Sequence, residues 1–157
     1  MRTETIPVSV LVMSLLAGGC AGDLYQQRAD AMKSHTKAFY QHLRADRVTA
    51  ATHENERLEA LAGQIEATIL RRQNQLADSE VDRDWMQAKA AREAALENWL
   101  ALAKYLTVKK QYPQARGTYE RILVTYKDAR YRTYADQARA GLRDLDMILA
   151  PSKGAGS

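Results

Sequence analysis

The chain has 157 residues, three prolines, one cysteine and a formal net charge of +4. This length is typical of one domain, the ordinary apolar fraction excludes disorder along the whole chain, and a lone cysteine excludes an internal disulfide. The charge is uneven: residues 20–103 carry −2 (11 basic, 13 acidic) and residues 104–157 carry +6 (11 basic, 5 acidic). Such a basic half is typical of a solvated helical surface, and also of a surface that binds an anionic partner.

The N-terminus has the organisation of an export signal. Arg2 precedes an apolar run over residues 6–17, and small residues at 17–19 lead to Cys20. A run of about a dozen apolar residues fits the core of a signal peptide. It is too short for a transmembrane helix, which needs about 20 residues.

The stretch LLAGGCAG around Cys20 resembles the lipobox of bacterial lipoproteins, although Ala17 stands where leucine is usual. The resemblance implies that residues 1–19 are a cleaved signal peptide and residues 20–23 a lipidated N-terminus. It also implies attachment to the envelope, at the outer membrane facing the periplasm, because Ala21 and not aspartate follows the cysteine. Two or more acyl chains make a stable anchor. The alternative is an ordinary secretory peptide cut nearby, which would leave a free thiol.

Residues 24–78 are predicted to be a long N-terminal helical segment, because they contain no proline and carry apolar stripes at helical spacing. The first stripe comprises Tyr25, Ala29, Met32, Thr36, Phe39 and Leu43, and the second Leu58, Leu61, Ile65, Ile69 and Leu76. Between them, residues 48–52 are rich in β-branched side chains and offer Thr49 and Thr52 as N-caps. A hairpin and one long helix with a bend both remain open.

Residues 79–150 are predicted to form three further helices. Ser79 and Asp82 have the spacing of a capping box at a helix that extends from about 80 to 111. Pro113 is suited to the first position of a helix over 113–126, and a turn over 127–130 precedes a helix over 131–149. Residues 151–157 are expected to be a flexible tail. The predicted fold is all-α, a bundle of antiparallel helical hairpins.

Residues 99–128 resemble a tetratricopeptide repeat. The matching positions are Trp99, Leu102, Ala103, Leu106, Ala115, Tyr119 and Ile122, although Ala103 replaces the usual glycine and Leu106 the usual tyrosine. The resemblance implies that the small alanines let two antiparallel helices approach while the large side chains fill the space beside them. One repeat cannot close its own core. The N-terminal helices or another protein must therefore cover its open face.

The sequence offers no catalytic set. His35 and His42 lie seven residues apart with Asp46 four residues later, which is not a spacing typical of a metal site. Phosphate-binding loops and the GxSxG and HExxH motifs are absent from the sequence. We therefore expect no enzyme activity, no metal and no cofactor. Tyrosines in the basic half are expected to pack between helices rather than to bind nucleic acid.

The sequence favours a non-enzymatic interaction adaptor. By analogy with tetratricopeptide lipoproteins, it would hold an envelope protein in a secretion, pilus or outer-membrane assembly machine. The partner would be bound in a helical groove with a basic rim of Lys109, Lys110, Arg116, Arg130 and Arg132. The main alternative is a homo-oligomeric spacer or ring component built from the long helices, and an envelope enzyme or ligand carrier is a third.

Overall fold

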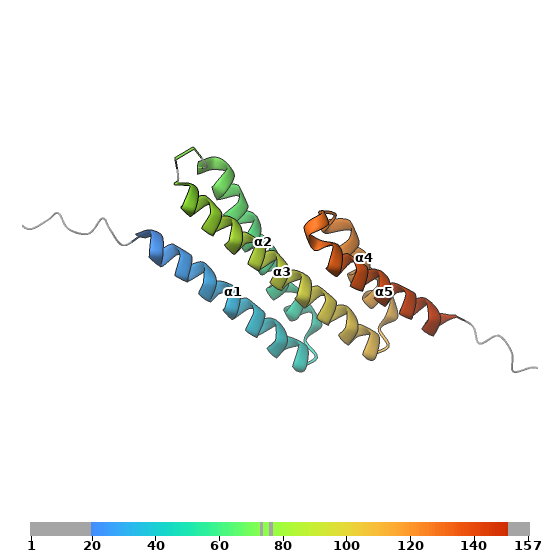
Figure 1. Cartoon of the computed structure of the whole chain (residues 1–157). Coiled ribbons are helices and arrows are strands. Elements are labelled where there is room, and N and C mark those ends of the chain that lie inside the picture. Colours follow the sequence, from blue (N-terminus) through green and yellow to red (C-terminus); the bar gives the residue numbers. More distant parts are fainter. Residues whose placement is uncertain (1–19, 73, 76, 151–157) are drawn as a thin grey trace, which may run out of the picture.

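The computed structural model describes residues 20–72, 74–75 and 77–150, and these residues confirm the all-α class. The helices are α1 (Cys20–Arg44), α2 (Val48–Arg72), α3 (Asp78–Val108), α4 (Tyr112–Thr125) and α5 (Arg132–Leu149), with a single 3-10 turn, η1 (Ala129–Tyr131), before α5 (Figure 1). In this described part of the chain, no helix combines the length and the hydropathy that a membrane span requires.

A sharp turn over residues 45–47 makes α1 and α2 a hairpin. Asp46 adopts a positive φ of 58°, a conformation that a short polar side chain tolerates, and the Arg47 amide donates to the His42 carbonyl at 2.9 Å. The amide of Ala51 then donates to the Arg47 carbonyl, so α2 begins before the residues expected to cap it. The prediction of Thr49 and Thr52 as N-caps was wrong, because both lie inside α2.

The start of α3 also differs from the predicted capping box. The Glu80 carboxylate accepts from the backbone amide of Ala77 at 3.3 Å, and Ala77 immediately precedes the helix. Ser79 and Asp82 lie within the helix, one and four residues after its first residue, Asp78. The sequence contained the correct class of signal, an acid at the third helical position. The predicted pair, Ser79 with Asp82, is replaced by Ala77 with Glu80, two residues earlier in the chain.

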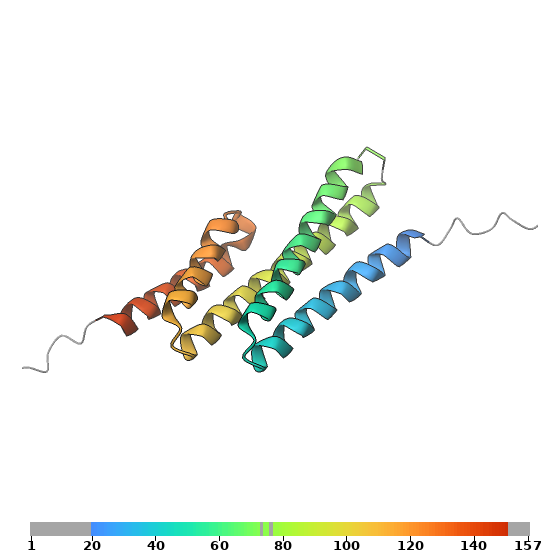
Figure 2. The ribbon, with the colours of Figure 1, turned by 180° about the vertical axis from the view of Figure 1, so that it is seen from behind.

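Helix α3 organises the bundle because it contacts each of the other four α-helices. In Figure 1, α1 and α2 lie along one side of α3, and α4 and α5 lie beside its C-terminal half. Seen from behind (Figure 2), the end of the α2–α3 hairpin extends beyond α4 and α5. The N-terminal helices therefore pack on the predicted repeat-like region and do not form a separate unit.

All five helices contribute to one hydrophobic core. Phe39 from α1, Ala51 from α2 and Leu145 from α5 belong to the same buried cluster as residues in the C-terminal half of α3 and one face of α4. A smaller cluster around Ile65 and Ile69 fills the space between α2 and the first half of α3. Burial of large apolar side chains, each contributing about 1.5–3 kcal/mol, is the main force that holds the helices together.

Candidate partner-binding groove

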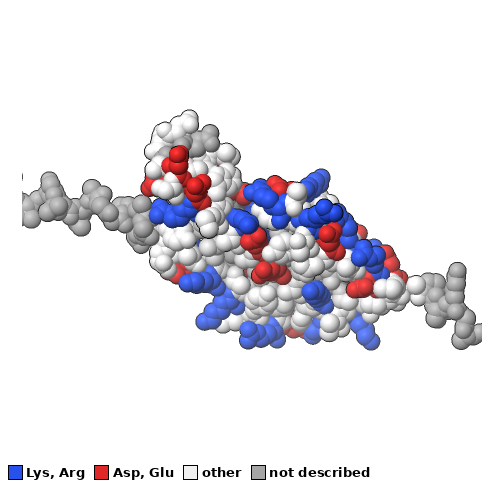
Figure 3. All heavy atoms as spheres, viewed as in Figure 1, with Lys and Arg blue, Asp and Glu red and all other residues white. Residues whose placement is uncertain are grey.

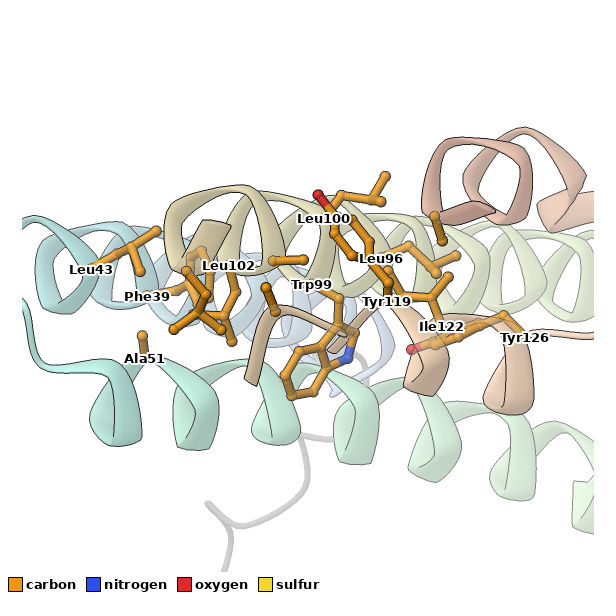
Figure 4. Close-up of a cluster of buried hydrophobic side chains, with 14 of the residues drawn as sticks. Phe39, Leu43, Ala51, Leu96, Trp99, Leu100, Leu102, Tyr119, Ile122 and Tyr126 are labelled. Carbon is orange, nitrogen blue, oxygen red and sulfur yellow. The ribbon is translucent and has the colours of Figure 1, made fainter. Parts of the chain in front are cut away.

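The seven positions of the repeat-like motif pack together in the core. Trp99, Leu102, Ala103 and Leu106 come from α3, and Ala115, Tyr119 and Ile122 come from α4; all seven are buried in the main cluster. Figure 4 labels four of the large members among the buried side chains of the cluster: Trp99, Leu102, Tyr119 and Ile122. Ala103 and Ala115 are fully buried, as expected where two helices approach closely.

Helix α2 packs on α3 and reaches α4 through the carboxylate of Glu59. This carboxylate accepts hydrogen bonds from Trp99 Nε1 at 2.9 Å, from the Tyr126 hydroxyl at 2.5 Å and from Arg121 Nη2 at 2.8 Å. The Arg121 guanidinium also lies 4.2 Å from the centroid of the Trp99 ring. In Figure 4 the Trp99 ring points from α3 toward α2. One carboxylate thus links three helices.

The Tyr126 hydroxyl is held in its protonated form. Burial raises the pKa of Tyr126 well above its ordinary value, and the hydrogen bond to Glu59 raises it further. A phenol donates only when it is protonated, so this raised pKa maintains the bond between α4 and α2.

The five basic residues expected to rim a groove lie in separate environments. Four of them form ion pairs with acidic neighbours: Lys109 with Asp46, Arg116 with Asp146, Arg130 with Asp128 and Arg132 with Asp136. Lys110 lies two residues after the end of α3 and has a positive φ of 58°. Of the five, Arg130 alone lines the groove described below. The structure therefore does not gather this set into one rim.

The described residues form a groove between α3 and α5, which we call the α3–α5 groove. It comprises two adjoining hollows with volumes of about 580 and 360 Å³, and Lys104 and Gln137 line both. The floor of the smaller hollow forms where the buried Tyr119 ring lies against Gly141. A side chain at position 141 would occupy the space that this ring fills.

Charges of both signs alternate along the α3–α5 groove. Glu93 and Glu97 line one end, Lys104 lies in the middle and Asp144 lies at the other end. Glu97 is exposed, and its carboxylate accepts from the Tyr134 hydroxyl at 3.4 Å. Lys104 has no ion-pair partner within the described part of the chain. The groove can therefore offer a donor and acceptors to a bound polypeptide.

Sequence reasoning missed these groove residues, although a signal was present. Glu93, Glu97 and Lys104 are four and seven residues apart, which places them on one face of α3. Gln137 and Gly141 have the same relation on α5. Each set had the spacing of an ordinary polar helix face. Only the packing of α5 against α3 brings the two faces together.

The histidines of α1 lie apart from the groove. His35 Nδ1 is 2.7 Å from a carboxylate oxygen of Glu54 on α2, so this pair links the first hairpin. The described residues contain no cluster of three metal-ligating side chains.

Cys20 is the first residue of α1, and its side chain lies outside the described part, as do residues 1–19 and 151–157. The expectations for the signal peptide and for the C-terminal tail therefore fall on residues without a structural description. Comparison with protein-family models, with curated proteins and with solved structures finds no match to this chain.

Proposed function

We propose that the chain is a lipoprotein of the bacterial envelope, attached through Cys20, that holds a protein partner in the α3–α5 groove. The lipobox-like stretch LLAGGCAG supports the attachment and the periplasmic side of the outer membrane as its location. The repeat-like packing of α3 and α4 supports an adaptor related to tetratricopeptide proteins. In this proposal the protein is a non-catalytic scaffold.

The groove is the observation that carries the adaptor role. Its walls are formed by faces of two helices, and it combines apolar residues such as Leu100 with charged groups such as Lys104 and Glu97. Grooves of this kind accept an extended segment or an amphipathic helix of a partner. Charge alternation along the walls selects a polypeptide with complementary charges and sets its register.

Site-specific crosslinking in cells tests the groove. A photo-reactive amino acid at Lys104 or Gln137 should capture an envelope protein, whereas the same group at Lys37 on the exposed face of α1 should not. Lys104→Glu should reduce co-purification of that protein about tenfold, equivalent to 1.4 kcal/mol. Lys37→Glu is the matched control and should have no effect. Equal capture from α1 and from the groove would contradict the assignment.

Acyl labelling and processing of the precursor test the lipid anchor. Cys20→Ala should abolish incorporation of a labelled fatty acid and leave an uncut precursor of higher mass. If membrane attachment and labelling survive this substitution, the proposal that Cys20 carries a lipid anchor is wrong.

Light scattering on a Cys20→Ser variant separates the adaptor from a self-assembling spacer. The adaptor is expected to be a monomer that binds its partner. An oligomer of fixed size that persists on dilution would instead favour the spacer or ring component.

A further inference from the structure

Exposed apolar side chains gather at one end of the bundle, where α1 begins, α2 ends and α3 begins. They form a set that we call the anchor-end patch: Leu24 (43% exposed), Tyr25 (39%), Leu70 (62%), Trp85 (38%) and Met86 (73%). Figures 1 and 2 show that these helix ends project beyond α4 and α5. No helix of the described bundle covers this end.

Hydrogen bonds and charge contacts hold α1 and α3 side by side at this end. Gln87 Nε2 donates to the Tyr25 carbonyl at 2.9 Å, and the Arg83 guanidinium lies 5.4 Å from the Tyr25 ring centroid. Arg28, one turn after Tyr25 on α1, pairs with Asp84 of α3 at 3.1 Å. Tyr25 and the segment that carries Trp85 and Met86 are therefore at the same level of the bundle.

The register of α2 against α3 places Leu70 at the same end. Glu66 of α2 pairs with Arg92 of α3, and Leu70 follows Glu66 by one helical turn. Trp85 precedes Arg92 by seven residues, or two turns on the same face. Because the two helices run in opposite directions, both steps lead from the Glu66–Arg92 pair toward the α2–α3 connection.

The first turns of α1 connect this end directly to the anchor, an argument that rests on the proposed attachment at Cys20. Helix α1 begins at Cys20, so no extended linker separates the cysteine from the bundle. At 1.5 Å per residue, Leu24 and Tyr25 lie about 6–8 Å along the helix from the anchored residue. A lipid at Cys20 therefore brings this end of the bundle to the bilayer surface.

We infer that the anchor-end patch is a lipid-contacting face that enters the headgroup region of the bilayer and fixes the orientation of the protein on the membrane. Tryptophan and tyrosine are the residues enriched at membrane–water interfaces, and the patch carries one of each. The occupant is the lipid surface itself, because the anchor delivers the patch to it.

The charges at this end largely cancel, so attraction to the bilayer should come mainly from the apolar side chains. Arg71, Arg72 and Arg83 are balanced by Asp78, Glu80 and Asp82, and Figure 3 shows acidic and basic side chains side by side over this region. Binding should therefore require no anionic lipid and should persist in about 1 M salt, where the screening length is about 3 Å. The α3–α5 groove begins at Glu93, so it lies about 20–45 Å along α3 from the membrane end.

The composition of the chain permits a direct test. Cys20 is the single cysteine, so the mature chain (residues 20–157) can be coupled at that position to a maleimide-bearing lipid in phosphatidylcholine vesicles. The two tryptophans report separately, because Trp99 is buried and Trp85 is exposed. Brominated acyl chains in the vesicles should quench most of the Trp85 emission, and Trp85→Phe should remove that quenching.

A matched pair of variants controls for general hydrophobicity. Leu70→Ser with Met86→Ser should lower the quenching of Trp85, whereas Val124→Ser with Met147→Ser, which changes exposed apolar residues away from the patch, should not. Trp85 emission that is the same in brominated and ordinary vesicles, with unchanged access to acrylamide, would overturn the inference. The coupling is chemical, so this failure would leave the cellular lipidation of Cys20 to be decided by the acyl-labelling experiment.

Discussion

Gly141 is the position where a single added methyl group should damage the fold most clearly. A Cβ built at Gly141 would lie within 2.7 Å of three carbons of the Tyr119 ring, far closer than van der Waals contact. The ring is buried among core residues of α3 and α4, so it cannot rotate away freely. Gly141→Ala should therefore push α5 away from α4 and deform the floor of the α3–α5 groove.

The expected magnitude follows from two opposing effects. Alanine is favoured over glycine inside a helix by about 1 kcal/mol, whereas overpacking a core costs about 1–3 kcal/mol. The matched control is Gly117→Ala in α4, where no atom lies within 4 Å of the added Cβ and only the helix-propensity gain applies. The two variants should differ in free energy of unfolding by about 2 kcal/mol, or about 4–8 °C in Tm.

Thermal and urea unfolding followed by far-ultraviolet circular dichroism measure this difference. Tyr119→Leu provides the second arm, because removal of the ring should abolish most of the penalty of Gly141→Ala in the double variant. If Gly141→Ala stabilises the protein as much as Gly117→Ala, or if the penalty persists without the Tyr119 ring, the close approach of α5 to α4 is refuted.

Three further predictions concern the polar groups of the core. Glu59→Ala should lower the free energy of unfolding in urea by about 2–3 kcal/mol, because it leaves the donors of three side chains without their acceptor. Glu59→Gln, which keeps a neutral acceptor, should cost less, and equal losses for the two variants would contradict the role of position 59 as the shared acceptor. The raised pKa of Tyr126 means that folding favours the protonated phenol. Its contribution to the free energy of unfolding is full below the unfolded pKa of about 10 and falls as the pH rises above that value. Tyr126→Phe should therefore make the alkaline loss of stability shallower, and a loss of unchanged slope would refute the assignment. Asn98 is buried with neither side-chain polar atom hydrogen-bonded in the described structure, so Asn98→Leu should raise the free energy of unfolding by about 1 kcal/mol, and a lower Tm would contradict this.

Helical periodicity in the sequence correctly located most of the core. Phe39, Leu43, Ile65 and Ile69 lie in the predicted stripes, and each is buried. The spacing of Trp99 and Tyr119 likewise indicated a packed helical hairpin. These predictions succeed because an α-helix has 3.6 residues per turn. The spacing of apolar residues in the sequence therefore shows which side chains lie on the same face and are buried together.

The ends of the helices were predicted less well. The candidate caps at Thr49 and Ser79 lie inside α2 and α3. The turn before α2 is made instead by Asp46 in a left-handed conformation, and the amide before α3 is bonded by the Glu80 carboxylate. Several residues near each boundary had suitable chemistry, and the final choice depended on how neighbouring helices pack. A cap contributes only about 1 kcal/mol, which the packing of whole helices readily outweighs.

By itself, the sequence determined the helical class, the approximate extent of the three C-terminal helices and the side of most helices that is buried. The tertiary structure decided which faces meet. Helix α2 packs on α3, where Glu59 accepts from Trp99 across 40 residues of sequence, and α5 meets α3 to form the groove at Lys104. It also paired four of the five basic residues expected to form a rim with acids, so that their positive charge does not gather in one place. The reason is physical: helix formation and amphipathicity depend on residues within a few turns, whereas register between distant helices depends on how their side chains pack together.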